Sequence, residues 1–513
     1  MKENIRVRFA PSPTGPLHIG GVRTALYNYL FAKGHGGTFI LRIEDTDQNR
    51  YVEGAEDYII EALKWLNLVP GEGVGFGGDL GPYRQSERKD MYAEYALRLV
   101  DAGHAYYAFD SDEDLKAIRA EYESRKETFK YDSTTRGEMN NSLNMPEEDW
   151  RALVQTDISY VIRLKVPEDE DIIFQDMVRG EVKFNSSQLD DKVLLKADGM
   201  PTYHMANIVD DHLMQISHVI RGEEWLPSTP THVLLYRFLG WEDSMPAFCH
   251  LPLILKPTGK GKLSKRDGAK FGFPVFPLDW RDESTGDNYM GFREQGFTPE
   301  AVVNFLALLG WSPSDDQEIM SLDELVERFD ASRINKAGAR FDYDKAKWFN
   351  QQYISQTPDI ELAPVVKDVL ASNGYTADIG FAEKYAGLFK ERVEFIAEFK
   401  YAGYYFFEDV KSYDEKNVRK RWKADNVSHF LSLKEMISGI SDFSPAVIEG
   451  AIKEFMTENG LSFGVIFPIL RIALTGSMSG PSVFEILSLM GKDKAVDRLA
   501  TSFSHFDKLV END

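Results

Sequence analysis

The sequence predicts an α/β fold in the N-terminal part of a 513-residue chain and an all-helical fold in its C-terminal third. Residues 1–105 alternate short strand-like runs with longer helix-like runs, which is typical of a nucleotide-binding parallel sheet. Residues 106–196 break this pattern with charged and polar stretches, and helical periodicity dominates from Pro299 onward. A chain of this length can build about three or four domains with cores of their own.

Each element follows from a local pattern. The expected strands are Ile5–Ala10 and Gly37–Ile43, and the expected helices are Val22–Lys33, Gly54–Leu66 and Arg88–Ala102. The parallel sheet is expected to resume near Val193, after a polar stretch at Lys130–Asn144, and the segment from Leu251 leads into a lysine-rich loop.

The loop Pro11–Gly21 joins the first strand to the first helix and is rich in Pro and Gly. A strand–loop–helix unit of this kind directs free backbone N–H groups and the positive end of a helix dipole at one point, which suits a phosphate. His18, just before the helix, can donate hydrogen bonds to phosphate oxygens. Alone, such a loop is more often an ordinary turn.

Lys262–Arg266 places two lysines three residues apart within a Gly- and Lys-rich stretch. This composition favours a mobile loop that carries point charges. Alone, it is more often a solvated surface.

Taken together, the two segments resemble the signature motifs of class I aminoacyl-tRNA synthetases, the His-Ile-Gly-His and Lys-Met-Ser-Lys-Ser types. Gly21 replaces the last His and Arg266 the last Ser. Further segments resemble glutamyl-tRNA synthetase and cover nearly the whole chain: Val7–Gly15, Leu41–Asp47, Gly81–Arg88, Pro201–Asn207, Val219–Trp225, Phe341–Lys345 and Leu474–Gly476. A helical C-terminal third resembles the bacterial type, because glutaminyl and archaeal-type glutamyl enzymes read the anticodon with β-barrels.

The resemblance implies a domain order. A Rossmann-type catalytic domain would occupy residues 1–105 and 197–240, with an acceptor-stem-binding domain inserted at 106–196. A mostly helical stem-contact domain with the Lys262–Arg266 loop would follow at 241–340, and an α-helical anticodon-binding domain at 341–513.

The resemblance also implies the reaction. The α-carboxylate of L-glutamate attacks the α-phosphate of ATP, and glutamyl-adenylate then transfers its glutamyl group to the 3′ end of tRNA(Glu). Ser12, His18, Gly20, Gly21 and Lys265 are expected to bind ATP. His18, Lys262 and Lys265 are the expected catalytic residues, because the task is to stabilise charge on phosphate oxygens, with Mg²⁺ sharing that charge.

Glutamate has opposite charges at its two ends, and each calls for its own partner. Arginine pairs with a side-chain carboxylate in a planar fork, and Arg8 and Arg221 match the family positions. Glu44 matches the carboxylate that holds the α-ammonium group. Ala10, Ser12, Tyr203 and Asn207 complete the expected pocket, although Tyr203 and Asn207 could instead satisfy hydrogen bonds at a strand end.

Four acids, Asp45, Asp47, Asp210 and Asp211, suggest a metal site, but adjacent acids more often serve as caps and turn formers. No protein side chain is therefore expected to bind a metal. The single cysteine, Cys249, permits no internal disulfide and no zinc site of several thiolates, so no zinc is expected. Cys249 is expected in the core, and the cysteine usage suits a reducing cytoplasm.

The net charge of −23 lowers non-specific RNA binding but leaves room for local basic patches. Lys416–Lys423 contains five basic residues and no acid, with Trp422 available for stacking on a base. A solvated helix face is the equal alternative. No apolar run reaches the ~18 residues that a membrane span needs, and there is no N-terminal signal pattern. We expect a cytoplasmic monomer without membrane association.

Arg392 aligns with the arginine that discriminating family members use to read the anticodon, and Arg471 is the rival reader. An arginine has only donors, so it can pair with an unpaired C, the third letter of the glutamate anticodon, and is opposed by G. Arg392 could also be a solvated helix residue. Whether tRNA(Gln) is charged as well stays open.

The chain between the lysine loop and Phe292 is longer than the family leads us to expect. Phe271–Asp287 is interpreted as an insertion of ~15–20 residues, which matches the length of a packed loop. Its aromatics, Phe271, Phe273, Phe276 and Trp280, are expected to pack on the stem-contact domain; restraint of the lysine loop is the second possibility.

Three other classes fit less well. A small nucleotidyltransferase would not explain Leu41–Asp47 or the helical third. A truncated relative that glutamylates a modified tRNA base would lack an anticodon domain. A non-catalytic RNA-binding paralogue would be expected to have lost His18, Lys265 or Glu44, and all three are present.

Overall fold

The computed structural model describes residues 4–511. The chain divides into two compact units, with the boundary between Ala346 and Lys347. Helix α12 (Tyr343–Gln356) contains this boundary. The finer domain limits expected from the sequence stay predictions. No helix in the described part of the chain is long and apolar enough to cross a membrane.

A seven-stranded sheet forms the centre of the first unit, in the order β3-β2-β1-β9-β10-β6-β7. Its strands are β1 (Arg6–Phe9), β2 (Thr38–Leu41), β3 (Glu72–Gly73), β6 (Asp171–Asp176), β7 (Gly180–Asn185), β9 (His218–Gly222) and β10 (Ala247–Leu251). Neighbouring strands are parallel except at the β6–β7 hairpin. The predicted α/β fold with a parallel sheet is confirmed.

The chain leaves β1 toward β2 and β3 on one side and later continues through β9 and β10 on the other. The strand order therefore reverses between β1 and β9. In open α/β sheets, ligands bind at such a reversal, outside the carboxyl ends of the strands.

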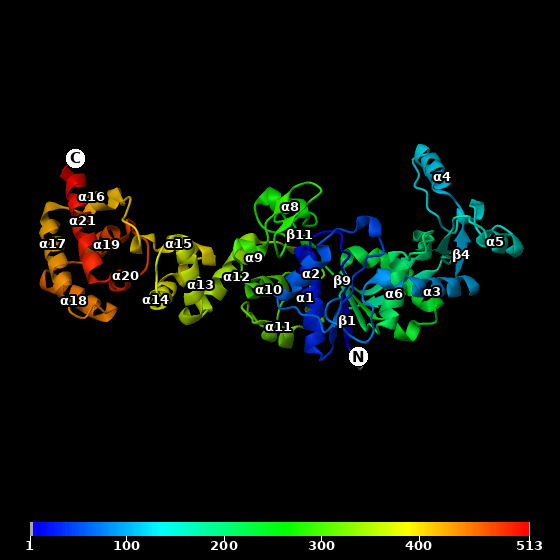
Figure 1. Ribbon diagram of the computed structural model, residues 1–513, viewed down its shortest axis with the longest axis horizontal. Helices are drawn as coiled ribbons and strands as arrows, with labels where there is room; N and C mark the ends of the chain where they lie inside the picture. The colour runs from blue at the N-terminus through cyan, green and yellow to red at the C-terminus, as the bar shows by residue number, and fades with distance from the viewer. Residues whose placement is uncertain (1–3, 512–513) are drawn as a thin grey trace. The chain divides into compact units, whose positions relative to one another are not determined.

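Helices pack on the sheet, and Figure 1 shows α1 beside β1 and β9. Helix α1 (Ile19–Gly34) packs on β1, β2 and β9, and helix α7 (Thr229–Phe238) packs on β6. The same unit contains α2 (Ala55–Trp65), α3 (Lys89–Asp101) and α6 (Tyr203–Leu213). Helix α1 is buried on most sides, because it contacts β1 and β9 as well as α10 (Pro299–Ala307) and α11 (Leu322–Arg328). This packing fixes the loop that precedes α1.

The expectation that the parallel sheet resumes near Val193 is wrong. Val193 begins β8 (Val193–Leu195), which pairs with β5 (Val161–Leu164), and β5 pairs in turn with β4 (Ala105–Ala108) in a separate antiparallel sheet. Helices α4 (Asp112–Ser124) and α5 (Glu147–Val154) lie in the same segment. The parallel sheet instead gains β6 and β7 from the expected insertion. A short apolar run fits either sheet, so its pattern cannot decide between them.

The rest of the first unit carries the lysine segment. Its strands are β11 (Ile254–Leu255), β12 (Trp280–Arg281), β13 (Asn288–Tyr289) and β14 (Ala339–Arg340), and its short helices are α8 (Lys265–Phe271) and α9 (Phe292–Gln295). Lys265 and Arg266 open helix α8, whereas the composition predicted a mobile loop. Ser264 and Asp267 form a capping box that starts this helix. The surrounding lysines and glycines favoured a loop, so this helix-start signal was missed in the sequence.

The second unit is helical, as Figure 1 shows for α13–α21. Its helices are α13 (Asp359–Ser372), α14 (Ile379–Phe389), α15 (Phe399–Ala402), α16 (Glu415–Arg421), α17 (Ala424–Gly439), α18 (Pro445–Glu458), α19 (Phe463–Thr475), α20 (Val483–Met490) and α21 (Lys492–Glu511). The all-helical prediction for the C-terminal third is confirmed.

The prediction that Trp422 is available for base stacking is wrong. Its side chain is 1% exposed and packs against Phe430, Phe503 and Phe506, and its indole N–H donates to Asp507. Trp422 follows α16 as its C-cap residue, and its ring is buried in the core, whereas Lys416 and Lys420 on the helix are exposed. Trp422 is a core residue.

Candidate functional site

A cavity of about 1010 Å³ lies at the reversal point of the parallel sheet. Its wall includes residues that follow β1, β2, β9 and β10. The residues predicted to bind ATP and glutamate line this one cavity: Arg8, Ala10, Ser12, His18, Gly20, Gly21, Glu44, Tyr203, Asn207, Arg221, Lys262 and Lys265. Arg266 does not line it. The individual roles of these residues stay predictions.

His18 caps the N-terminus of α1, and its Nδ1 accepts a hydrogen bond from the Gly20 N–H at 3.1 Å. Burial, with the nearby charges of Lys262 and Lys265, lowers the pKa of His18 to about 4. The imidazole is therefore neutral at pH 7, and because Nδ1 accepts, its proton is on Nε2. Nε2 is buried and has no hydrogen-bond partner in the described part of the chain, and the backbone of Ser264 lies near the ring. His18 can thus donate one hydrogen bond on the side of the lysine segment.

Lys265 lies directly over the loop before α1. A Cβ atom added to Gly15 would lie 3.1 Å from the Nζ atom of Lys265, and Gly15 has φ +134°, which favours glycine. The local packing also explains why Gly21 stands where the signature motif of the family has its last His. A Cβ atom at Gly21 would lie 2.6 Å from Cδ1 of Leu17, so Leu17 occupies the space that a larger residue would need.

Lys262 forms an ion pair with Glu224, with 2.6 Å between Nζ and Oε1. Burial opposes ionisation of Glu224, yet Lys262 holds the pKa of this carboxyl below its ordinary value. Lys262 is therefore already neutralised, whereas Lys265 has no ion pair in the described part of the chain. Of the two signature lysines, Lys265 has the charge that is free to meet an anion.

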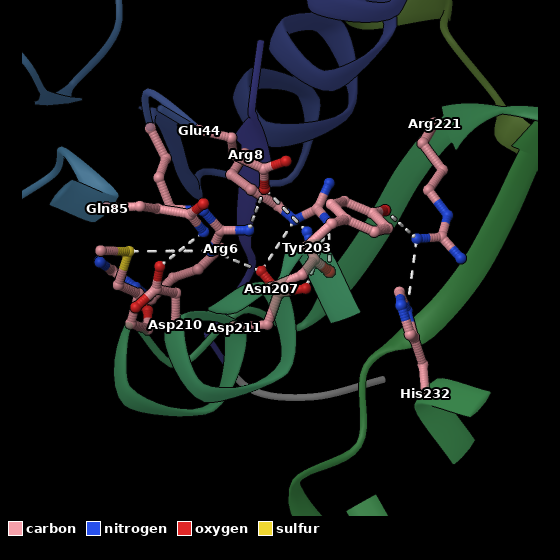
Figure 2. A network of polar contacts seen from close by, with 12 residues as sticks. Arg6, Arg8, Glu44, Gln85, Tyr203, Asn207, Asp210, Asp211, Arg221 and His232 are labelled. Carbon is pink, nitrogen blue, oxygen red and sulfur yellow. Dashed lines mark hydrogen bonds and ion pairs between the residues drawn. The ribbon is translucent and has the colours of Figure 1, made fainter. Parts of the chain in front are cut away.

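Arg8 and Arg42 share one buried acid. Asp211 on α6 accepts from Nε and Nη2 of Arg8 at 3.0 and 3.2 Å and from Nη1 of Arg42 at 2.7 Å. Burial opposes ionisation, yet the two arginines keep the pKa of Asp211 below its ordinary value. Figure 2 shows Arg8 and Asp211 turned toward each other. The charge of Arg8 is thus balanced inside the protein, and Nη1 is the part of its fork that Asp211 leaves open.

Glu44 is bound to the same network. Its Oε1 accepts from Nδ2 of Asn207 at 2.8 Å and from Nη2 of Arg42 at 3.1 Å. Burial raises the pKa of Glu44, although Arg42 and Arg8 oppose the rise. The hydrogen bonds within the described chain use Oε1, so Oε2 is the oxygen that a ligand could take.

Arg221 differs from Arg8 because every partner of its guanidinium is neutral. Nη1 donates to the Tyr203 hydroxyl at 2.8 Å, and Nη2 donates to the Thr229 hydroxyl at 2.9 Å. Figure 2 shows Tyr203 and His232 both turned toward its guanidinium. Arg221 is 5% exposed and makes no ion pair among residues 4–511. A buried cation without a counter-charge, in the wall of a cavity, is suited to an anionic ligand.

Asp210 and Asp211, which the sequence assigned neither to a metal nor to a cap, serve as buried partners of arginines. Both lie inside α6 and are buried, and Asp210 pairs with Arg88 at 2.7 Å. Asp45 instead accepts from the Ser86 backbone and hydroxyl. Among residues 4–511, no three His, Cys, Asp or Glu side chains form a group that could hold a metal ion.

Several residues of the site were not identified from the sequence: Arg42, Asp176, Glu224, Thr229, His232 and His250. Asp211 was considered only as a possible metal ligand. The signal for Asp211 was visible, since two acids end an otherwise apolar run from Met205 to Val209. Acids in such a position need buried partners. The histidines gave no comparable signal, because their partners come from distant strands.

The aromatic insertion contacts both expected neighbours. Phe273 packs on Phe341, with ring centroids 4.8 Å apart, just beyond the expected end of the stem-contact domain at residue 340. Phe276 instead meets the edge of His18 at 6.0 Å, and Trp280 packs on Tyr58 of α2 at 5.3 Å. The expectation of packing on the stem-contact domain alone is therefore wrong for these two rings.

A backbone hydrogen bond ties the insertion to the loop before α1. The N–H of Ile19 donates to the carbonyl of Val275 at 3.0 Å. The insertion thus touches the His18 loop and, through Phe273 and Val275, the helix that begins at Lys265.

Arg392 and Arg471 belong to the second unit and lie near each other. Burial raises the pKa of Tyr405, and the charges of Arg471 and Arg392 both oppose this rise. Burial also lowers the pKa of Arg471, and the charge of Arg392 lowers it further. Arg392 is exposed at the end of the turn Lys390–Arg392, whereas Arg471 is half-buried and donates to the Pro481 carbonyl. Arg392 is the more accessible of the two candidate anticodon readers.

The chain matches two family models. Residues 4–348 match "tRNA synthetases class I (E and Q), catalytic domain", and residues 345–502 match "Anticodon binding domain". With the cavity at the sheet reversal and the paired signature segments, this match shows that the chain belongs to the class I tRNA synthetases of the glutamate and glutamine group.

Its relatives are more specific. The chain is 55% identical over 501 residues to a glutamate–tRNA ligase of Porphyromonas gingivalis, covering 97% of this chain and 98% of the relative. It is 54% identical over 499 residues to a glutamate–tRNA ligase of Bacteroides fragilis, with the same coverage. A crystal structure of a glutamate tRNA ligase from Elizabethkingia meningosepticum, in complex with its amino acid, superposes with a TM-score of 0.92 at 50% identity, covering 98% of this chain and 99% of that one.

Proposed function

We propose that this chain is a glutamate–tRNA ligase, which activates L-glutamate with ATP and transfers it to the 3′ end of tRNA(Glu). The names of the relatives support the reaction, and the single observation that supports the substrate is Arg221. Its buried guanidinium lines the cavity and has only neutral partners, so it is suited to a carboxylate.

A second part of the cavity wall suits an ammonium group. Glu44 offers Oε2, while Asn207 and Arg42 hold Oε1 in place. Arg221 and Glu44 would thus bind the side-chain carboxylate and the α-ammonium group of one glutamate, with Nη1 of Arg8 and the Tyr203 hydroxyl completing the contacts. Ala10 and Ser12 would line the space between them.

ATP would lie across the loop Pro11–Gly21. His18 would donate from Nε2 to a phosphate oxygen, and Lys265 would neutralise the phosphates from its position over Gly15. The glutamate α-carboxylate forms a bond to the α-phosphorus, and the bond to the pyrophosphate oxygen breaks. No protein nucleophile takes part, so the residues contribute position and charge.

Mg²⁺ would enter as part of its ATP complex and share the neutralisation of the leaving pyrophosphate. We propose Lys262 as a second cation for pyrophosphate, provided that it leaves Glu224. The terminal ribose hydroxyl of tRNA then attacks the carbonyl carbon of glutamyl-adenylate, and AMP leaves. A cytoplasmic, monomeric, zinc-free enzyme remains our proposal for the state of the protein.

Charging assays test the proposal. The purified chain is incubated with ATP, Mg²⁺ and tRNA(Glu) and with labelled glutamate, glutamine or aspartate, and charged tRNA is measured. We expect charging with glutamate alone. Failure with glutamate, under conditions in which the Porphyromonas gingivalis relative succeeds, would overturn the proposal. A parallel arm with tRNA(Gln) decides whether the enzyme charges one tRNA or two.

A further inference from the structure

A row of polar residues runs from Arg221 away from the cavity, across three neighbouring strands of the sheet. Arg221 on β9 lies opposite His250 on β10 in the strand register, and Asp176 ends the next strand, β6. The Nε of Arg221 donates to Nε2 of His250 at 3.1 Å, and Nδ1 of His250 lies 2.6 Å from Oδ2 of Asp176.

These contacts determine where the proton of His250 is. Nε2 must accept, because arginine has only donors, so Nδ1 carries the proton and donates to Asp176. His250 is fully buried, and a proton on Nε2 would oppose the N–H of Arg221. Burial, together with the charge of Arg221, lowers the pKa of His250 even though Asp176 opposes the shift. Geometry and charge both favour a neutral ring.

Asp176 is itself held in place. Its Oδ1 accepts from the backbone N–H groups of Val178 and Arg179 at 2.9 and 2.8 Å, and its Oδ2 also accepts from the N–H of His250 at 3.1 Å. The carboxylate therefore has donors on both oxygens, and it orients His250 without touching Arg221.

We propose that His250, oriented by Asp176, is a positioning residue for substrate selection: it fixes Arg221 through a neutral acceptor and leaves the charge of Arg221 for the carboxylate of the amino acid. A direct acidic partner in place of His250 would hold the arginine equally well but would cancel that charge, as Asp211 does for Arg8. The neutral ring holds the guanidinium of Arg221 in place without putting a negative charge beside it.

The other side of the guanidinium repeats this arrangement. Nη1 of Arg221 lies 3.4 Å from Nδ1 of His232, and Nε2 of His232 lies 3.2 Å from Nδ1 of His204. Burial lowers the pKa of His232 well below its ordinary value and that of His204 to about 4, so both rings are neutral at pH 7. Arg221 is thus surrounded by neutral acceptors on both sides.

The inference rests on the proposed function, and matched variants of His250 test it in the full-length protein. His250→Gln keeps an acceptor that can reach Arg221, His250→Leu keeps a similar volume without one, and His250→Asp adds a counter-charge. Asp176→Asn keeps the shape but places an amide N–H where Oδ2 accepts two donors. ATP–pyrophosphate exchange with tRNA(Glu) present gives the KM for glutamate and for ATP, and thermal unfolding checks that each variant folds.

We expect the KM for glutamate to rise about tenfold or more in His250→Leu and Asp176→Asn, because an orienting hydrogen bond to a charged group is lost. His250→Gln should stay within about threefold of the wild type, and the KM for ATP should be unchanged in all three. His250→Asp should fold and yet lose glutamate activation.

Equal increases in both KM values, or a glutamate KM in His250→Leu like that of the wild type, would overturn the inference. If His250→Leu does not fold, the KM values for glutamate of His250→Gln and Asp176→Asn are compared instead. Equal values in these two variants would overturn the inference. Failure of the wild-type chain to charge tRNA with glutamate would instead overturn the proposed function, so the two failures are distinguishable.

Discussion

Lys262 and Glu224 form an ion pair, 2.6 Å from Nζ to Oε1, which joins the lysine segment to the segment after β9. Lys265, three residues later, lies over Gly15 and makes no ion pair in the described chain, although the charge of Asp282 acts on it from a greater distance. The two signature lysines are therefore in different electrostatic states, although the sequence presents them as equivalent. The difference leads to the first prediction.

Lys265→Ala should slow adenylate formation by about 10²–10³ and leave the KM for glutamate nearly unchanged, because one charge-stabilising group is lost from the phosphate side. Lys262→Ala should have a smaller effect, since this lysine must first separate from Glu224. Single-turnover formation of glutamyl-adenylate measures both rates. Lys260→Ala, an exposed lysine of the same segment, is the control. Wild-type turnover in Lys265→Ala would show that its role is assigned incorrectly.

Arg8 and Arg221 should respond differently to substitution. Arg221→Gln should raise the KM for glutamate by at least tenfold and change the thermal midpoint little, because its partners are neutral and can hydrogen-bond to an amide. Arg8→Gln should lower the free energy of unfolding by about 3–5 kcal/mol, because it breaks a buried pair with Asp211. Thermal and chemical denaturation give the midpoint and the free energy of unfolding, and ATP–pyrophosphate exchange gives the KM for glutamate. Equal stability losses in both variants would contradict this division.

His18 should make the stability of the protein depend on pH. Its pKa in the folded state is about 4, below the ordinary value of 6.5, so the unfolded state binds the proton more tightly between these values. Stability from this residue is complete above about pH 6.5 and is lost as the pH falls toward 4. Between pH 7 and pH 5 the wild type should therefore lose about 2 kcal/mol more than His18→Gln.

Denaturant titrations of both proteins at the two pH values measure this difference, and identical pH slopes would show that His18 is not held neutral. A second consequence concerns catalysis. Because the ring is neutral throughout, the rate of adenylate formation should show no ionisation of His18 between pH 6 and pH 8.

Adenylate formation should depend on bound tRNA(Glu). By family resemblance, the acceptor end of the tRNA shifts the ATP site toward its productive arrangement, which is a ligand-dependent change in population. We expect ATP–pyrophosphate exchange to be slow with glutamate alone and fast after tRNA(Glu) is added, and not after a tRNA for an unrelated amino acid. Full exchange without tRNA would contradict this coupling while leaving the proposed reaction intact.

Arg392→Gln should narrow the difference in kcat/KM between tRNA(Glu) and tRNA(Gln) by about tenfold or more. A bidentate arginine–base contact is worth roughly 1–3 kcal/mol of discrimination, a range taken from DNA readout. The residue is exposed beside the half-buried Arg471, whose substitution by Gln serves as the comparison. If both tRNAs are charged more slowly in the same proportion, Arg392 contacts phosphate or supports the fold.

Local sequence determined most of the elements. The Pro- and Gly-rich loop before a helix, the strand–helix alternation and the long helical third each follow from short-range rules, and the parallel sheet and the helical unit are confirmed. The resemblance of dispersed motifs placed Arg8, Glu44 and Arg221 together, and the structure places all three in the wall of one cavity. The resemblance suffices for these residues because they lie near or just after the carboxyl ends of β1, β2 and β9, where an open α/β sheet binds its ligand.

Only the tertiary structure decided the electrostatic state of each residue. From the sequence, Arg8 and Arg221 have the same expected role. In the structure, Asp211 balances the charge of Arg8, whereas Arg221 contacts only neutral groups. Trp422 and Val193 show the same limit, because a ring or a short apolar run can be buried against any surface that the fold supplies. Whether a charge is free depends on partners distant in the chain, and these partners meet only when the strands are assembled in the sheet.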